Sequence, residues 1–301
     1  MSTLHQLLSE FHIESRTDCT LADLTTFKVG GPADVVLYPK TVEECAALLC
    51  FANKTGQKLV YLGNGSNILG QDAGCRDWIL KTDGLNELTI NEQGFIQVGA
   101  GVRTVKVSSF AAKKGLAGFE FAHGIPGTMG GAIYMNAGAY GGSMEQVVVR
   151  THYLDAQGNL HTLNANQHRF GYRHSFFMEH PEYLIVGCEL KLTPGNPTEI
   201  QKTIDELQKR RREKQPLEFP SAGSTFKRPV GYFAGKLIED AGLKGYSVGD
   251  AQVSEKHAGF VINRGNATGA QVRQLIADVQ KKVYEQFGVQ LECEVQSLGE
   301  E

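Results

Sequence analysis

The segment 124–142, GIPGTMGGAIYMNAGAYGG, contains seven glycines and one proline in nineteen residues. Glycine reaches positive φ values and lets another group approach the backbone closely, at an entropic cost that a purely structural loop has little reason to accumulate. Successive backbone N–H groups in such a segment form a concave site for an anion. The segment therefore predicts contact with a phosphate or diphosphate. The alternative is a tight connection between strands.

A second glycine-rich loop, LGNGSNILG at 62–70, follows an expected strand at 58–62. It mixes glycine with Asn and Ser, whose side chains bond to the backbone at turns. We interpret it as a second phosphate cradle. The loop does not fit a dinucleotide fingerprint, because the third glycine of GxGxxG comes only at Gly70 and no helix pattern opens there.

A phosphate-binding Walker loop is also excluded. Gly231, Gly235 and Lys236 resemble one, but the spacing is one residue short. Leu237 stands where Ser or Thr would hold magnesium. The beginning of a helix explains this stretch better.

The order of expected elements indicates an α+β chain. A first helix precedes the strand 33–39, and Thr41 with Glu44 caps a helix that Gly56 ends. The expected strands of the middle region are rich in Val, Leu, Ile and Tyr. We interpret this region as α+β with a largely antiparallel sheet. Further strands are expected at 94–102, 147–154, 160–163, 183–192 and 259–263, together with a strand at 290–298 that buries Leu291, Cys293 and Val295. Helices are expected at 103–114, 198–214, 233–240 and 268–288, with Thr198 and Gln201 capping the second of them.

Composition excludes several classes of protein. The 301 residues are 41% hydrophobic and 21% charged, which is ordinary for a globular protein and predicts two or three domains. Lys and Arg number 30 against 33 Asp and Glu, and the resulting charge of −3 offers no field for nucleic acid or an anionic membrane. Six scattered cysteines without a CxxC pair fit reduced thiols in cytoplasm. The histidines show no ligand spacing, so we expect no metal.

Several blocks in fixed order resemble the UDP-N-acetylenolpyruvoylglucosamine reductases, the flavoenzymes that make UDP-N-acetylmuramate for bacterial peptidoglycan. The resemblance covers nearly the full chain and is more specific than any single glycine pattern. The interval 177–183 is too short for the tyrosine-bearing loop of one branch, so the chain is similar to the shorter branch. The matching blocks are TTFKVGGPAD, LGNGSNIL, GIPGTMGGAIYMNAGAYG, FGYRHS, PSAGSTFKRP, AGKLIEDAGLKG, VSEKHAGFVIN and LECEV.

The resemblance implies an α+β fold with a two-subdomain FAD-binding part of the para-cresol methylhydroxylase/vanillyl-alcohol oxidase type and a C-terminal α/β substrate-binding domain. The implied FAD-binding subdomains are 1–80, with 296–301 as a possible addition, and 81–197; residues 198–295 would form the substrate-binding domain. FAD would be bound non-covalently and NADPH would be the hydride donor. Two glycine-rich loops can surround a diphosphate with N–H donors, which explains why neither needs a Rossmann pattern.

Three residues match the family's catalytic positions. Arg173 of FGYRHS would stabilise the enolate that forms when hydride reaches the enolpyruvyl group. Ser224 of SAGSTFKRP would protonate the carbon, and Glu294 of LECEV would assist the arginine or orient the proton transfer. From sequence alone each has a plainer interpretation, as a surface arginine, a turn serine and a solvated strand residue. Periodicity cannot separate Glu294 from Glu292.

The remaining site residues are expectations of the same kind. The residues expected to bind FAD are Gly63, Asn64, Gly65, Ser66, Asn67, Ile68, Leu69, Gly124, Ile125, Pro126, Gly127, Thr128, Gly130, Gly131, Asn136 and Gly138. The residues expected to bind the substrate, chiefly its diphosphate, are Lys227, Arg228, Lys236, His257 and Asn263.

Two other functions stay open at this point. The chain could be an FAD-dependent sugar or alcohol oxidase of the same flavoprotein class, which the SAGSTFKRP and LECEV blocks disfavour. It could also be a nucleotide-binding module without turnover, which a purified protein unable to bind flavin would favour. In the favoured interpretation the partner is a small sugar nucleotide, without nucleic acid or membrane, and we expect a cytoplasmic monomer.

Overall fold

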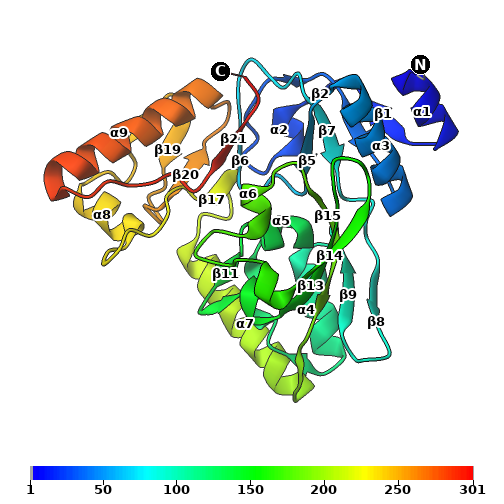
Figure 1. Ribbon diagram of the computed structural model, residues 1–301. Helices are drawn as coiled ribbons and strands as arrows, with labels where there is room; N and C mark the ends of the chain where they lie inside the picture. Colours follow the sequence, from blue (N-terminus) through cyan, green and yellow to red (C-terminus); the bar gives the residue numbers. More distant parts are fainter. Residues whose placement is uncertain (1–2, 301) are drawn as a thin grey trace. The chain divides into compact units, whose positions relative to one another are not determined.

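The computed structural model describes residues 3–300 and divides into two compact units (Figure 1). Unit 1 comprises the chain up to Arg16 together with Val35–Asn64 and Asp77–Arg210. Unit 2 comprises Thr17–Asp34, Gly65–Arg76 and the chain from Arg211 onward. The sequence-based division into 1–80, 81–197 and 198–295 stays a prediction.

The first sheet of unit 1 is a mixed sheet with α3 (Val42–Thr55) in the connection between two of its strands. Thr41 caps α3 by accepting from the N–H of Glu44 at 3.2 Å, and Gly56 ends it at φ +71°, as the sequence predicts. Three of its strands are parallel to one another, and the strand at one edge is antiparallel to them. In spatial order the strands are β1 (Glu14–Arg16), β4 (Val36–Tyr38), β7 (Trp78–Lys81) and β5 (Leu59–Leu62).

The second sheet of unit 1 is antiparallel throughout, which confirms the prediction for the middle region. In spatial order its strands are β14 (Leu160–Asn164), β13 (Val148–Leu154), β15 (Leu184–Leu190), β9 (Ile96–Gly99) and β8 (Leu88–Ile90). The other elements of unit 1 are α1 (Leu4–Glu10), α4 (Thr104–Lys113), α5 (Met129–Tyr134), α6 (Phe176–Glu179), most of α7 (Pro197–Lys214), the short strand pairs β10 (Leu116–Ala117) with β16 (Thr193–Pro194) and β11 (Gly138–Ala139) with β12 (Gly142–Ser143), and the 3₁₀ turns η1 (Glu120–Gly124), η2 (Met144–Gln146) and η3 (Ala165–Gln167).

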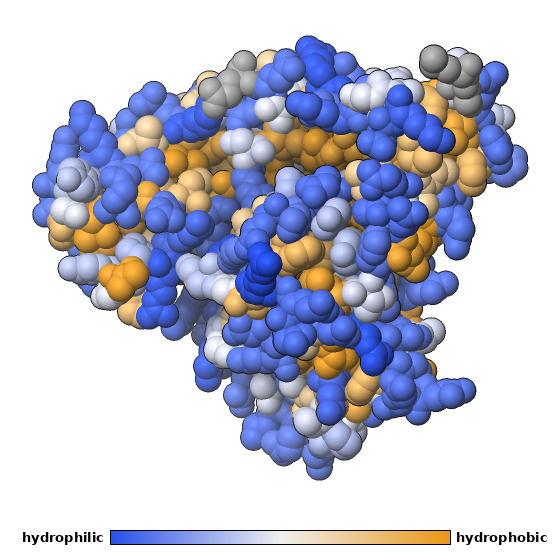
Figure 2. Space-filling view, viewed as in Figure 1, coloured by the Kyte–Doolittle hydropathy of each residue, from blue (hydrophilic) through white to orange (hydrophobic). Residues whose placement is uncertain are grey.

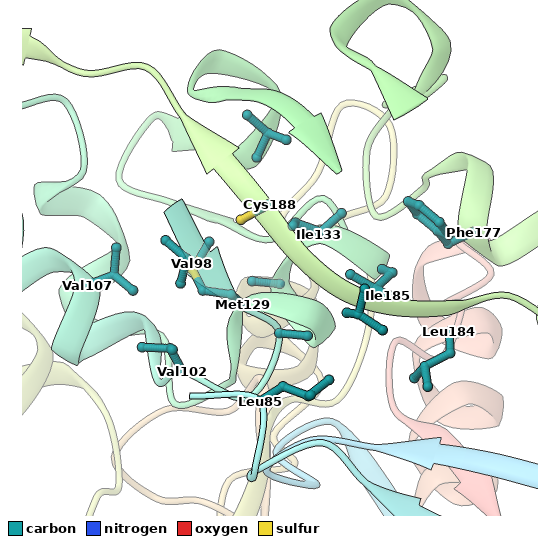
Figure 3. Close-up of a cluster of buried hydrophobic side chains, with 14 of the residues drawn as sticks. Leu85, Val98, Val102, Val107, Met129, Ile133, Phe177, Leu184, Ile185 and Cys188 are labelled. Atoms are coloured by element: carbon teal, nitrogen blue, oxygen red, sulfur yellow. The ribbon is translucent and has the colours of Figure 1, made fainter. Parts of the chain in front are cut away.

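The core of unit 1 fixes the helix inside the glycine-rich segment. Met129 and Ile133 of α5 are fully buried and lie near side chains of β9 and β15, among them Val98 and Cys188 (Figure 3). Burial of apolar side chains of this size stabilises a protein by roughly 1.5–3 kcal/mol each. The six residues of α5 are therefore held by packing rather than by helix propensity.

The start of α7 differs from the prediction. The helix begins at Pro197, and the side chain of Asn196 accepts from the N–H of Thr198 at 2.9 Å. Proline is favoured at the first helical position because its missing N–H has no partner there in any case. The predicted cap by Thr198 and Gln201 is wrong, because the amide of Gln201 instead bonds to Asp205.

Unit 2 contains an antiparallel sheet and the long helix α9 (Gly269–Phe287). Thr268 and Gln271 form the capping box of α9, and Gly288 ends it at φ +66°, as predicted. The spatial strand order is β17 (Ser221–Ser224), β20 (Phe260–Asn263), β19 (Ala251–Val253) and β18 (Ser247–Val248). The other elements are α2 (Leu21–Leu24), α8 (Ala234–Asp240), the pair β2 (Cys19–Thr20) with β3 (Pro32–Ala33), and the parallel pair β6 (Ile68–Gly70) with β21 (Gln296–Leu298).

The C-terminal segment is not the continuous strand that its alternation predicts. Leu291 and Val295 are buried, but Cys293 is exposed, and β21 begins only at Gln296. Cys293 pairs with Phe226 in one isolated β-bridge. Further along the chain, β21 pairs instead with β6. Because the pairing partner changes, one alternating pattern does not hold over the whole segment.

Polar side chains cover most of the face shown in Figure 2, with apolar ones in separate patches. No helix within residues 3–300 is long and apolar enough to cross a membrane.

Candidate active site

The two glycine-rich segments meet in unit 1. The side-chain amide of Asn64 donates to the carbonyl of Pro126 at 2.6 Å, and the guanidinium of Arg103 donates to Oδ1 of Asn64. A Cβ added to Gly63 would lie 2.3 Å from Oγ1 of Thr128. Glycine is therefore required where the loop after β5 passes the start of α5.

A buried lysine supports this junction. Nζ of Lys81, a residue that is 7% exposed, donates to the carbonyl of Gly63 and forms an ion pair with Asp83 at 3.0 Å. The ammonium group of Lys81 therefore lies beside the loop, between the carbonyl of Gly63 and the carboxylate of Asp83. Our sequence analysis missed Lys81 and Arg103. The signal for Lys81 was a lysine at the end of the otherwise apolar stretch WILK.

Two glycines of the segment 124–142 have packing roles of their own. The N–H of Gly130 donates to the carbonyl of Ala100 at 2.8 Å, and a Cβ there would lie 3.1 Å from that of Ala100. A Cβ on Gly138 would lie 2.6 Å from the carbonyl of Gly142 across a hairpin. Gly131 differs, because it is exposed and an added Cβ would have room. Neither intramolecular packing nor a positive φ therefore requires glycine at position 131.

The junction has a polar atom that fits a phosphate. Oγ1 of Thr128 is buried and has no hydrogen-bond partner among the described residues. A Cβ added to Gly63 or to Gly131 would lie within 4 Å of this oxygen. Buried hydroxyls normally form a hydrogen bond, and a bound anion would supply the acceptor that Oγ1 of Thr128 lacks. The charges of Lys81 and Arg103, which contact Gly63 and Asn64 of the loop, favour that anion.

The backbone before Thr128 is held by α4. The N–H of Thr104 donates to the carbonyl of Gly127 at 3.1 Å, and its hydroxyl donates to the carbonyl of Ile125. Gly124 closes the preceding 3₁₀ turn, where the N–H of Ile125 donates to Ala122 at 3.0 Å. The segment 124–128 is therefore a fixed part of unit 1.

The second half of the 62–70 loop belongs to unit 2. Asn67 donates through its side-chain amide to the carbonyl of Glu294 at 3.0 Å and accepts from the N–H of Gln296 at 3.0 Å. Ile68 and Leu69 continue as β6, and Ser66 precedes them in the loop. A Cβ on Gly65 would lie 2.4 Å from the carbonyl of Leu24. This half of the loop thus holds the segment that carries Glu294.

Ser224 and Glu294 lie on neighbouring segments of unit 2. The N–H of Glu294 donates to the carbonyl of Thr225 at 2.8 Å. Ser224 ends β17 after an irregularity at Gly223, which has φ +78° and open space around a would-be Cβ. Such a bulge re-aims the following side chain. The result is an exposed hydroxyl at Ser224 with a half-buried carboxylate on the adjoining segment.

The structure separates the two carboxylates that periodicity could not. The side chain of Glu292 is 72% exposed and forms an ion pair with Lys227 at 3.2 Å. Glu294 is half-buried, and its backbone is fixed on both sides by Thr225 and Asn67. Glu294 is therefore the more buried of the two, and the carboxylate of Glu292 is engaged by Lys227 at the surface.

Arg173 lies at a tight turn of unit 1. Gly171 and His174 exchange backbone hydrogen bonds of 3.1 and 3.2 Å, and Arg173 between them has φ +54°. This backbone conformation is uncommon for a residue other than glycine and is found at functional sites. The side chain of Asn136 donates to the carbonyl of Gly171 at 2.9 Å, which ties the turn to the glycine-rich segment.

The residues expected to bind the substrate are differently disposed. Lys236 forms an ion pair with Asp240 one helical turn away. Cζ of the Arg228 guanidinium lies 4.0 Å from the centre of the Phe233 ring. Burial lowers the pKa of His257, whose Nδ1 accepts from the N–H of Gly259 at 3.1 Å. A ring with a lowered pKa is neutral near neutral pH, so His257 adds no charge opposite a diphosphate.

The geometry of Asn263 favours a structural role. Its side chain is 1% exposed, and Oδ1 accepts from the N–H groups of Gly265 and Ala267 at 2.9 and 3.0 Å. Its amide donates to the carbonyls of Phe27 and Lys28 at 3.3 and 3.1 Å. All of its donors are used inside unit 2, which leaves none for a substrate.

Comparison with known proteins identifies both parts of the chain. A model described as "FAD binding domain" matches residues 33–164, and one described as "UDP-N-acetylenolpyruvoylglucosamine reductase, C-terminal domain" matches residues 215–298. The first match and the phosphate-compatible junction within it define an FAD-containing oxidoreductase. Within residues 3–300 no group of three or more metal-ligating side chains comes together.

Similar full-length proteins give the family. The chain is 48% identical over 276 residues to the UDP-N-acetylenolpyruvoylglucosamine reductase of Caldanaerobacter subterraneus subsp. tengcongensis, covering 92% of this chain and 91% of that one. It is 45% identical over 289 residues to the reductase of Lactiplantibacillus plantarum, covering 96% and 95%. The crystal structure of the enzyme from Thermus caldophilus superposes with a TM-score of 0.80 at 32% identity, covering 95% of this chain and 98% of that one. The chain belongs to the UDP-N-acetylenolpyruvoylglucosamine reductase family.

Proposed function

We propose that this chain reduces UDP-N-acetylglucosamine enolpyruvate to UDP-N-acetylmuramate with NADPH, a step in bacterial peptidoglycan precursor synthesis. Membership of the family and the match to an FAD-binding domain support the reaction and the cofactor. When bound, FAD supplies the hydride transfer from NADPH to the enolpyruvyl group.

The proposed cofactor contacts centre on the junction of the glycine-rich segments. Thr128 would donate its unpaired hydroxyl to a phosphate oxygen, and exposed Gly131 would let a phosphate approach the backbone. Lys81 and Arg103, which hold Gly63 and Asn64, would offset the diphosphate charge locally. These two cations would give an anionic cofactor local positive charge, although the chain as a whole has a net charge of −3.

Three residues are proposed for the chemistry. Arg173 stabilises the negative charge that develops on the enolate and its carboxylate, where a fixed cation favours the transition state over the ground state. Ser224 delivers a proton to the carbon next to the carboxylate, and Glu294 orients that transfer.

One observation carries the assignment of the pair. The N–H of Glu294 bonds to the carbonyl of Thr225, the residue after Ser224, so two motifs about 70 residues apart in sequence are side by side. A proton donor as weak as serine needs a neighbouring group of this kind.

The proposed setting is the cytoplasm, because the sugar nucleotide and NADPH are both cytoplasmic metabolites. The proposed oligomeric state is a monomer.

Product analysis tests the function. Purified holoenzyme is incubated with NADPH and the enolpyruvyl sugar nucleotide, and the mixture is examined by mass spectrometry. The expected product is heavier than the substrate by two hydrogen atoms and forms in a one-to-one ratio with NADPH consumed. NADPH consumption that depends on oxygen and leaves the sugar nucleotide unchanged would reject the proposal and favour an oxidase.

A further inference from the structure

The turn that carries Arg173 is attached to the core of unit 1 at two points. Asn136 bonds to the carbonyl of Gly171 before the turn, as described above. After the turn, the hydroxyl of Ser175 donates to the carbonyl of Tyr134 at 2.6 Å, and Ser175 is fully buried. Both attachment points lie at the C-terminal end of α5, whose Met129 and Ile133 are fully buried in the core.

The side chain of Asn136 is committed to this task. It is 5% exposed, and its two amide hydrogens point to the carbonyl of Gly171 and, at 3.2 Å, to Oε2 of Glu145. Its Oδ1 accepts from the N–H of Glu145 at 3.0 Å. An amide with both hydrogens in use has no donor left for a flavin. Expecting Asn136 to bind FAD thus conflicts with its hydrogen bonds.

The backbone of the turn explains why such ties are needed. Arg169 and Arg173 both have positive φ, at +48° and +54°, and so does Asn136 at +40°. Conformations of this kind cost of order 1–3 kcal/mol each and persist only where the surroundings hold them. A turn released from its attachments would relax, and the guanidinium of Arg173 would move with it.

We propose that Asn136, together with Ser175, is a positioning residue for Arg173 in the reduction of the enolpyruvyl group, and is not a contact of the cofactor. This inference rests on the proposed function of Arg173. It assigns to the NAGAYGG end of the glycine-rich segment a part in the substrate half-reaction, whereas the GIPGTMGG end serves the cofactor.

The test uses Asn136→Gly, because glycine accepts the positive φ and removes only the side chain. Holoenzyme is examined for the dissociation constant of FAD, the rate of flavin reduction by NADPH, and the rate of flavin reoxidation by the enolpyruvyl sugar nucleotide. The expected result is an unchanged FAD dissociation constant, an unchanged reduction rate, and reoxidation slower by about 10- to 100-fold, the range expected for a small misplacement of a catalytic group. Arg173→Ala and the double variant complete a double-mutant cycle. In the double variant, Asn136→Gly should add little to the loss of reoxidation rate that Arg173→Ala causes.

Two results would overturn the inference while leaving the role of Arg173 in place. A raised FAD dissociation constant with normal reoxidation of the loaded enzyme would make Asn136 a cofactor contact. Independent, multiplicative losses in the double variant would show that Asn136 does not act through Arg173. If Arg173→Ala alone left reoxidation unchanged, the proposed role of Arg173 would fail, and the inference with it.

Two further variants keep the test decisive. Ser175→Ala removes the second tie without changing a residue of the glycine-rich segment, and the same two results apply to it if Asn136→Gly does not fold. Asn91→Gly is the control, because the side chain of Asn91 likewise bonds to the backbone: its Oδ1 accepts from the N–H groups of Gln93 and Phe95, both at 3.0 Å, in a turn between β8 and β9. It should leave both half-reactions unchanged, so a loss in Asn91→Gly equal to that in Asn136→Gly would count against positioning.

Discussion

The backbone N–H of Glu294 donates to the carbonyl of Thr225 at 2.8 Å. This bond joins the LECEV segment to the SAGST segment inside unit 2, and with them the proposed proton donor and its carboxylate partner. Asn67 holds the other side of Glu294 by donating to its carbonyl at 3.0 Å. Two bonds therefore hold the backbone of Glu294, and a substitution of its side chain leaves both in place.

Ser224→Ala should separate the two half-reactions. Flavin reduction by NADPH should continue at the original rate, because no proton is delivered to carbon in that step. Reoxidation by the enolpyruvyl sugar nucleotide should slow by about 100- to 10,000-fold, the usual contribution of general acid catalysis. Rapid-mixing absorbance of the flavin measures both. Ser247→Ala, which removes an exposed hydroxyl that bonds to the carbonyl of Gly245 at 3.0 Å, is the control. Equal behaviour of the two variants would contradict the role of Ser224.

Glu294→Gln and Glu292→Gln form a matched pair. Glu292 pairs with Lys227 at the surface, and exposed pairs contribute little, so its replacement should leave the rate within about twofold. Glu294→Gln should slow flavin reoxidation by about 100-fold or more without changing flavin reduction. The same loss in both variants would indicate a general effect of charge, and no loss in either would remove Glu294 from the mechanism.

Gly131→Ala should distinguish a cofactor contact from a structural glycine. An added Cβ meets only Oγ1 of Thr128, at 3.7 Å, and alanine favours the helix by up to about 1 kcal/mol. The protein without FAD should therefore be as stable as before or more so. Its FAD dissociation constant should rise about tenfold or more, because the methyl group would overpack a phosphate lying on the backbone.

Gly130→Ala is the comparison for that experiment. Its Cβ would lie 3.1 Å from Ala100, so the FAD-free protein should lose about 1–3 kcal/mol of unfolding free energy. Chemical denaturation and a fluorescence titration with FAD measure the two quantities. Unchanged FAD affinity in Gly131→Ala would place the diphosphate elsewhere.

His168 should make stability fall in mild acid. Its ring is fully buried, and because the carbonyl of Ala165 only accepts, Nδ1 carries the proton while Nε2 accepts from the hydroxyl of Thr151 at 2.8 Å. Burial lowers the pKa of His168 from its ordinary value of 6.5. Below pH 6.5 the unfolded chain therefore binds the proton more readily than the folded one, and this part of the stability, fully present above pH 6.5, is lost as the pH falls through the lowered pKa.

The measurement is the unfolding free energy by urea between pH 7.5 and 5. His168→Asn should have a lower unfolding free energy than the original chain at neutral pH. In acid its unfolding free energy should decline less steeply, the difference in slope being at most about 1.4 kcal/mol per pH unit. The same substitution at exposed His5 is the control. A decline in His168→Asn as steep as in the original chain would contradict the prediction.

Local features of the fold were predictable from sequence, and contacts between distant residues were not. Thr41, Gly56, Thr268 and Gly288 set helix ends through hydrogen bonds within a few residues, so their patterns suffice. The bond from Asn136 to Gly171 joins positions 35 residues apart, and nothing in either motif points to the other. The same holds for Lys81, whose position beneath Gly63 depends on the packing of β7 beside β5.

The candidate site was accessible to sequence reasoning mainly through the resemblance. Composition and periodicity alone could not separate Glu294 from Glu292, and they suggested that Cys293 is buried when it is exposed. The reason is that the segment changes its pairing partner from Phe226 to β6. The glycines of 124–142 likewise looked equivalent, although packing explains Gly130 and Gly138 and leaves Gly131 for another role.

The most direct test of the account is an anaerobic stopped-flow experiment on the FAD-loaded protein. The flavin is first reduced by one equivalent of NADPH and is then mixed with the enolpyruvyl sugar nucleotide or, separately, with oxygen. The account predicts full recovery of flavin absorbance with the sugar nucleotide within one turnover and a much slower reaction with oxygen. Reduced flavin that ignores the sugar nucleotide and is reoxidised rapidly by oxygen would contradict it.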